Sequence, residues 1–139
     1  MATLVNIKEI SARGFGACSN PRVLTEPASV RIRFVFATED SDFNEGEVEF
    51  RGVSAYRFTG KPLMKDVNLI DAYDRVSEIL KSPWVQEAES AIREKDSSRI
   101  QHRPGSMHHY ALYFDDHGCY ELLAEAFEVR LFEQGRGAQ

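Results

Sequence analysis

Alternating apolar and polar side chains mark two strands in the first half of the chain. Apolar residues hold every second position of residues 30–36, and a second alternating run covers residues 47–58. A period of two is typical of a strand with one buried face. Because only a short acidic loop separates the two runs, we expect an antiparallel hairpin. Gly52 and Ser54 are small residues on the otherwise bulky face of the second predicted strand. We expect that a neighbouring element packs closely there or that the strand bulges.

The middle of the chain contains a helix with a clear start. Ser82 offers an N-cap oxygen, Pro83 suits the first helical position, and an apolar stripe follows at helical spacing, so we predict a helix over residues 83–95. Residues 66–80 fit helical spacing as well as an edge strand, and we take the helix as the first interpretation. Residues 96–105 are polar and contain a Pro-Gly pair, which predicts a loop.

A second hairpin is expected toward the end of the chain. Residues 107–114 alternate as a strand, residues 115–118 (Asp-Asp-His-Gly) favour a turn, and residues 119–132 return as a long strand. The apolar positions of this long strand change parity near Ala126. We interpret that change as a bulge that bends the sheet.

The order of these elements predicts an α+β fold. Two hairpins flank a helical middle, so we expect a single two-layer domain over residues 1–139, with an antiparallel sheet of two hairpins and helical segments packed on one face. A length of 139 residues fits one ordinary domain of about 100–150 residues. Small residues and breakers in residues 1–25, and the tail at residues 134–139, predict flexible ends.

Two segments resemble parts of a group of bacterial proteins. Residues 108–116 (HHYALYFDD), followed by residues 118–121 (GCYE), are similar to the C-terminal hairpin of small bacterial α+β proteins of unassigned function. Residues 51–58 (RGVSAYRF) are similar to their earlier strand. The shared motifs consist of strand aromatics and a turn, so the resemblance implies a local structure and no activity.

Composition and charge narrow the classes of partner. Lys and Arg number 17 against 22 Asp and Glu, and the net charge of −5 is the wrong sign for a protein that holds nucleic acid through phosphate contacts. No segment has the run of about 18 apolar residues that a membrane-spanning helix needs, and we find no export signal. Two widely separated cysteines favour a reducing compartment. We therefore expect a cytoplasmic protein that binds neither nucleic acid nor membrane.

No cofactor is expected. The sequence Gly14-Phe15-Gly16 lacks the third glycine of a dinucleotide-binding loop. No Gly-x-Ser-x-Gly motif occurs either, so the sequence indicates no serine-hydrolase site.

The densest set of groups that could bind a metal or transfer protons lies in residues 108–121. His117 and Cys119 with Asp115 could hold zinc, although their spacing matches no strong zinc signature. Alternation also sends the two adjacent histidines of this segment to opposite faces of a sheet. Cys119 and His117 could instead act as nucleophile and base. A small metal-dependent or cysteine-dependent enzyme is therefore the alternative function.

Acidic side chains at the two expected turns are the candidate binding residues. They are Glu39, Asp40, Asp42 and Glu45 in the first loop, and Asp115 and Asp116 in the second. The first loop begins like a calcium loop but lacks its glycine and its final carboxylate, so we interpret it as a solvated tip whose charge attracts a basic partner.

The absence of a catalytic motif favours binding over catalysis. We expect a non-catalytic protein-interaction module of the immunity or accessory kind, which uses this acidic surface or a sheet edge to bind another protein. An open sheet edge also favours a homodimer.

Overall fold

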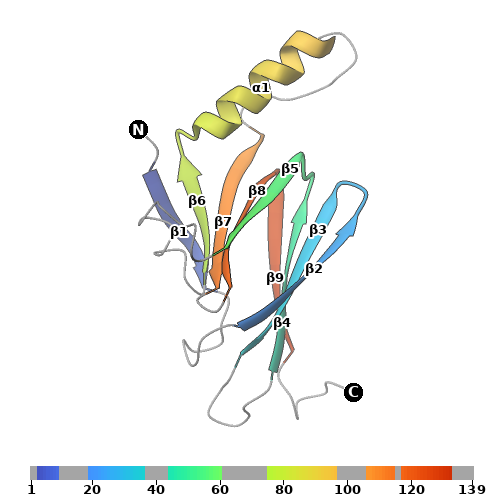
Figure 1. Cartoon of the computed structure of the whole chain (residues 1–139), viewed down its shortest axis with the longest axis vertical. Helices are drawn as coiled ribbons and strands as arrows, with labels where there is room; N and C mark the ends of the chain where they lie inside the picture. Colours follow the sequence, from blue (N-terminus) through green and yellow to red (C-terminus); the bar gives the residue numbers. More distant parts are fainter. Residues whose placement is uncertain are drawn as a thin grey trace.

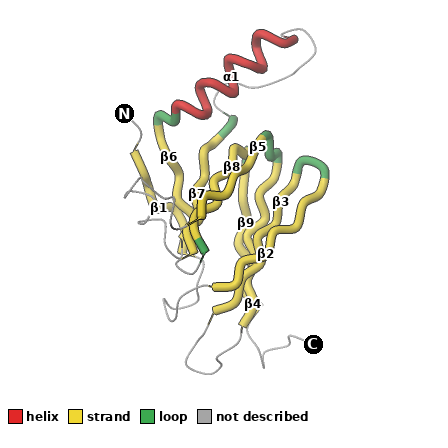
Figure 2. The backbone as a smooth tube through the Cα atoms, in the orientation of Figure 1, coloured by secondary structure: helices red, strands yellow, loops and turns green. Residues whose placement is uncertain are grey.

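Two antiparallel β-sheets form the body of the protein in a computed structural model that describes residues 3–9, 19–36, 44–60, 75–96, 106–114 and 117–132 (Figure 1, Figure 2). In these residues the strands are β1 (Thr3–Glu9), β2 (Ser19–Glu26), β3 (Ser29–Phe36), β4 (Asn44–Arg51), β5 (Ala55–Gly60), β6 (Arg75–Leu80), β7 (His108–Phe114), β8 (Gly118–Ala124) and β9 (Ala126–Phe132), and the helix is α1 (Pro83–Asp96). The five-stranded sheet has the order β1-β6-β7-β8-β5, and the four-stranded sheet has the order β2-β3-β4-β9.

The core lies between the two sheets. Alternation along each strand sends one set of apolar side chains inward, and both sheets contribute to the same buried cluster. The Phe34 and Phe114 rings, from opposite sheets, have centroids 6.0 Å apart, and those of Phe50 and Tyr110 are 5.7 Å apart. Tilted aromatic pairs at these distances are favourable beyond their buried area. Packing across this layer therefore holds the sheets together.

The prediction of a two-layer α+β domain is wrong. The layers are two sheets, and α1 continues beyond the end of β6 instead of covering a sheet face (Figure 1). Residues 75–80 of the expected helical middle form β6, because pairing with β7 and β1 on both sides outweighs an ambiguous periodicity. Residues 61–74 lie outside the described residues. The N-terminal positions for which we expected flexibility contain β1 and most of β2.

Several local predictions are confirmed. The β3–β4 and β7–β8 hairpins pair antiparallel, and α1 begins at Pro83. Ser82 caps the helix, because its Oγ accepts a hydrogen bond from the Val85 N–H at 3.2 Å. The loop predicted for residues 96–105 lies almost wholly outside the described residues. None of the helices in the described residues is long and apolar enough to span a membrane.

Two neighbouring strands pass together from one sheet to the other. β4 leads through residues 52–54 into β5, while β8 leads through Glu125 into β9. The Glu125 N–H donates to the Arg51 carbonyl at 2.9 Å, and the Ser54 N–H donates to the Leu123 carbonyl at 2.8 Å. We call this two-stranded unit the crossing ribbon. It explains the parity change that we interpreted as a bulge near Ala126: the chain there changes sheets.

Gly52 is required at the bend of the crossing ribbon. Its φ of +64° lies in the left-handed region, which side chains with a Cβ disfavour. A Cβ at this position would also stand 2.7 Å from Cδ of Glu125 on the neighbouring strand. The next residue fixes the bend to the β2–β3 turn, since the Val53 N–H donates to the Ala28 carbonyl at 3.0 Å.

Replacing Gly52 with alanine should therefore destabilise the protein. We expect Gly52→Ala to lower the free energy of unfolding by about 2 kcal/mol, from backbone strain together with displacement of the Glu125 side chain. The double variant Gly52→Ala/Glu125→Ala should recover the steric part and keep the backbone part. Urea unfolding followed by circular dichroism measures both. A Gly52→Ala protein as stable as the wild type would show that the bend is not required.

Candidate functional site

β5 forms one edge of the five-stranded sheet, and β1 forms the other. Among the described strands β5 pairs only with β8, so one side of its backbone faces away from the sheet (Figure 1). Tyr56 and Phe58 on this strand are each 47 % exposed. Their partners across the strand pair are the core residues Leu122 and Tyr120, and the Phe58 and Tyr120 ring centroids are 4.8 Å apart. The apolar surface of the core thus continues to an exposed edge.

The two edges of the four-stranded sheet are less open to pairing. The third residue of β2 is Pro21, which has no N–H to donate, and the register of this strand shifts between Ser19 and Arg22. β9 carries charged side chains at Glu128 and Arg130, which discourage the approach of another strand. β5 has no proline and no register shift, and its one charged side chain, Arg57, is bound to Glu121.

Arg57, between the two aromatics, points to the opposite face of the sheet and is held there. Its Nε and Nη2 donate to the two oxygens of Glu121, each at 3.1 Å, and its guanidinium carbon lies 4.2 Å above the Trp84 ring. A bidentate pair and a cation–π contact fix the side chain in one orientation. β5 is thereby tied through a side chain both to β8 and to α1.

The carboxylate that holds Arg57 is almost fully buried. The Glu121 side chain is 5 % exposed and also accepts a hydrogen bond from His109 Nε2 at 2.8 Å. Burial by itself would raise its pKa, but the hydrogen bonds from His109 and Arg57 outweigh burial and lower the pKa of Glu121 below its usual value. Glu121 is therefore an ionised carboxylate inside the protein. Its partners compensate the cost of burying that charge.

A cleft opens at the start of β5. It has a volume of about 360 Å³ and lies between the β2–β3 turn and the bend of the crossing ribbon. Val30, Val53 and Ala55 give it an apolar wall, and Thr25 and Ser29 line its other side. Tyr56 borders the cleft as well. The aromatic edge and the cleft therefore form one surface, which we call the β5 edge.

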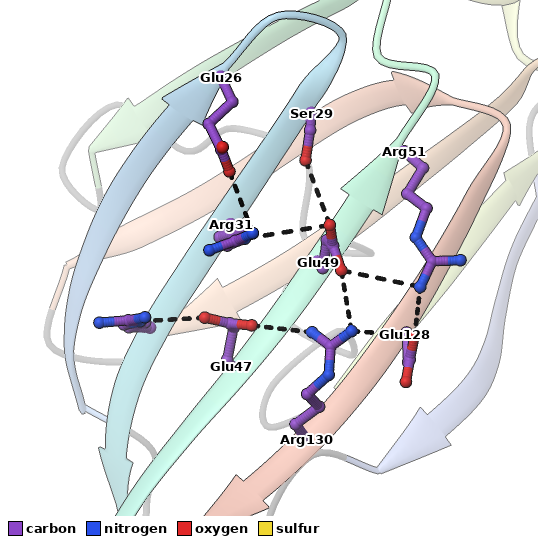
Figure 3. A network of polar contacts seen from close by, with 9 residues as sticks. Glu26, Ser29, Arg31, Glu47, Glu49, Arg51, Glu128 and Arg130 are labelled. Carbon is purple, nitrogen blue, oxygen red and sulfur yellow. Dashed lines mark hydrogen bonds and ion pairs between the residues drawn. The ribbon is translucent and has the colours of Figure 1, made fainter.

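The outward face of the four-stranded sheet carries paired charges instead (Figure 3). This charge ladder consists of Glu26, Arg31, Arg33, Glu47, Glu49, Arg51, Glu128 and Arg130. Strand register places opposite charges side by side, as with Arg33 opposite Glu47 and Glu47 opposite Arg130. Glu47 accepts from Arg33 Nε at 3.0 Å and from Arg130 Nη1 at 2.9 Å.

One like-charged pair in the ladder needs compensation. Glu49 and Glu128 stand directly opposite each other on β4 and β9, which is unfavourable without a bridging cation. Arg130 Nη2 donates to Glu49 at 3.0 Å and to Glu128 at 3.1 Å, and Arg51 pairs with both carboxylates. The hydrogen bond from Arg130 is the main reason that the pKa of Glu49 is lowered. Because these charges find partners within the chain, the ladder offers little unpaired charge to a ligand.

The candidate residues from the sequence fall mostly elsewhere. Glu39, Asp40, Asp42, Asp115 and Asp116 lie outside the described residues, so their role stays a prediction. Glu45 is described, and its half-exposed carboxylate accepts from Arg22 at 3.3 Å.

The proposed metal and nucleophile residues differ greatly in burial. His117 is exposed in the β7–β8 turn, whereas the Cys119 side chain is buried and its Sγ donates weakly to the Tyr120 carbonyl at 3.7 Å. Within the described ranges, no three or more His, Cys, Asp and Glu side chains gather as a metal site would require. Asp115, the third proposed ligand, lies outside those ranges.

Comparison with protein-family models, with curated proteins and with solved structures finds no match to this chain. Any function proposed for this chain must therefore rest on the geometry of its own residues. The sequence predicted binding at an acidic surface or a sheet edge but did not indicate which strand forms the edge, because β4 and β5 share one alternating pattern. The sequence Tyr56-Arg57-Phe58, which follows the small residues Gly52 and Ser54, was the available signal.

Removing the charge of Glu121 tests the buried pair. We expect Glu121→Gln to lower the free energy of unfolding by about 2 kcal/mol at pH 7, because Arg57 and His109 lose an ionised acceptor. Because the pKa of Glu121 is lowered in the folded protein, its charge stabilises the fold at pH values above the unfolded pKa of about 4.3. That stabilisation is lost as the pH falls through the folded-state pKa. The difference between wild type and variant should therefore shrink in acid. Urea unfolding at several pH values measures it.

Glu45→Gln is the matched control for that variant. Its carboxylate is half exposed, so the change should cost no more than about 0.5 kcal/mol. Equal losses in the two variants, or a Glu121→Gln loss independent of pH, would contradict the account of Glu121.

The charge ladder makes a separate prediction. Arg130→Met should lower the free energy of unfolding at low salt, because Glu49 and Glu128 then face each other with one bridging cation fewer. Salt should reduce the loss by screening the remaining repulsion. Arg22→Met, which breaks an exposed pair, is the control. Thermal unfolding at low and high salt measures both variants. Equal stability losses with the same salt dependence in Arg130→Met and Arg22→Met would contradict the prediction.

Proposed function

We propose that this protein is a binding module that adds an extended segment of a partner protein to the β5 edge. The observation that carries the proposal is the pair of half-exposed aromatics, Tyr56 and Phe58, on a strand that pairs on one side only among the described residues. Strand addition satisfies backbone donors and acceptors along such an edge, and alternate side chains of the added strand supply specificity.

The two faces of an added strand would meet different surroundings. On the core side, its side chains would lie beside Tyr56 and Phe58 and cover apolar surface that continues from the core. Apolar or aromatic residues at every second position of the partner suit that side. A small apolar side chain at one end fits the cleft of about 360 Å³ that Tyr56 borders.

The rigidity of β5 supports a binding role. The bend at Gly52 sets where the strand starts, and the ion pair of Arg57 with Glu121 fixes its middle. A surface that is already ordered loses less conformational entropy on binding than a flexible one. The strand is therefore prepared for a partner before the partner arrives.

The net charge of −5 favours a basic partner, because opposite charge speeds encounter. Glu45 at the start of β4, with the acidic residues Glu39, Asp40 and Asp42 of the preceding sequence, belongs to the same proposal as a source of attraction. An immunity or accessory role is one biological setting for a module of this kind. A second copy of the chain is the competing occupant of the edge.

Two matched serine substitutions test the proposal. Phe58→Ser removes an anchor of the β5 edge, and Phe132→Ser removes an equally exposed phenylalanine, 47 % in both cases, from β9. We expect tagged wild type and Phe132→Ser to retain the same stoichiometric partner from source-cell extract. Phe58→Ser should bind that partner at least about 30-fold more weakly, since buried aromatic anchors carry about 2 kcal/mol or more.

Quantitative mass spectrometry of the recovered proteins reads the result, and titration with the purified partner gives the affinities. Loss of the partner from Phe132→Ser as well, or its full retention by Phe58→Ser, would contradict binding at the β5 edge. Recovery of a second copy of the chain alone would assign the edge to self-association.

A further inference from the structure

A second cleft lies at the other end of the five-stranded sheet, where β6 turns into α1. It has a volume of about 250 Å³ and is lined by the end of β6, the first turns of α1 and the start of β7. Ser82 and His109 both border it. Ser82 Oγ and His109 Nδ1 are 2.7 Å apart, and His109 Nε2 and Glu121 Oε1 are 2.8 Å apart. Three side chains from three elements thus form one hydrogen-bonded relay.

The hydrogen atoms of this relay can be assigned from its two ends. A Glu121 carboxylate accepts from His109 Nε2, so an imidazole with a single proton carries it on Nε2 and has its lone pair on Nδ1. Ser82 Oγ already accepts from the Val85 N–H, and its own proton is directed to the Nδ1 lone pair. The hydroxyl therefore donates to the imidazole, and the imidazole donates to the carboxylate. Serine hydrolases use the same order of serine, histidine and carboxylate, although in the Ser-His-Asp triad Nε2 faces the serine and Nδ1 faces the carboxylate.

The surroundings of Ser82 suit a nucleophile. It stands directly before Pro83 at the start of α1, where the positive end of the helix dipole favours negative charge. The first turn has no acidic side chain. Lys81, directly before Ser82, has φ of +56°, a conformation that costs energy in a residue with a Cβ and that recurs at functional sites. β6, the strained residue Lys81, Ser82 and α1 follow one another directly along the chain.

We propose that Ser82 is an acyl-accepting nucleophile for small carboxylic esters, with His109 as its general base and Glu121 orienting the imidazole. This activity is independent of binding at the β5 edge. The cleft is too small for a large substrate. Leu80, Val85 and Met107 give it an apolar side, and the charged residues Glu78, Lys81 and Glu89 also line it. A short aliphatic acyl group is the substrate class that fits.

The chemistry balances with these groups and water. Ser82 Oγ bonds to the ester carbonyl carbon while its proton moves to His109 Nδ1, and the tetrahedral intermediate expels the alcohol, which takes that proton. Water then adds to the acyl carbon and gives a proton to His109. Collapse releases the carboxylic acid and returns the proton to Ser82. Glu121 stays ionised throughout, and its charge favours the imidazolium that forms twice in the cycle.

A fluorophosphonate probe tests the nucleophile directly in the whole protein. Attack by Ser82 Oγ would form an O–P bond and expel fluoride, with the hydroxyl proton passing to His109. We expect one adduct per chain by intact mass, and peptide mapping should place it on Ser82. His109→Gln should slow labelling at least about 100-fold, as loss of a general base does. Wild type should also hydrolyse p-nitrophenyl acetate with a burst of p-nitrophenol.

The variants separate catalysis from folding. Ser82→Asn lacks the hydroxyl but keeps an N-cap side chain, so it should fold and give no adduct. Ser90→Ala, an exposed serine on the same helix, should label like the wild type. Because peptide mapping is done on the wild type, an unfolded Ser82→Asn would not weaken the result. An unlabelled wild type, an adduct on another residue, or unchanged labelling in His109→Gln would overturn the proposal.

Discussion

The arrangement of the protein depends on the crossing ribbon, in which β4–β5 and β9–β8 change sheets side by side. The hydrogen bonds from Glu125 to Arg51 and from Ser54 to Leu123 keep the two strands paired where they bend. Because buried backbone groups must find partners, a bend in one strand requires a matching bend in the other. Gly52, with its positive φ and its closeness to Glu125, lets the chain meet that requirement. The two sheets, and the core between them, follow from this bend.

The same bend places β5 at an open edge and sets the position of its side chains. Tyr56 and Phe58 extend the core surface outward, while Arg57 reaches Glu121 on the far face. Glu121 also holds His109, which contacts the cap of α1. One buried carboxylate therefore links the binding edge to the helix. Burying a charge is costly, and its retention here with several partners agrees with a role in positioning both regions.

Much of the local structure could be predicted from the sequence, whereas the architecture could not. Alternation identified β3, β4, β7 and β8, and Ser82-Pro83 identified the start of α1, because these signals arise from neighbouring residues. The assignment to one sheet failed at Gly52 and Glu125, since a strand that changes sheets keeps its strand-like composition. The relay of Ser82, His109 and Glu121 was also invisible, because three separate elements bring it together. Ser82 was recognised only as a helix cap, and His109 and Glu121 only as members of the candidate cluster in residues 108–121.

The central claim is that β5 is an ordered strand with one side of its backbone open. Residue-resolved hydrogen exchange by NMR on the unbound protein tests this claim most directly. We predict alternation along residues 55–60: amides directed at β8 should be protected like those of the sheet interior, and those directed outward should exchange quickly. Uniform protection would show that something covers the edge, and uniform rapid exchange would show that the strand is not ordered. Either result would contradict the account.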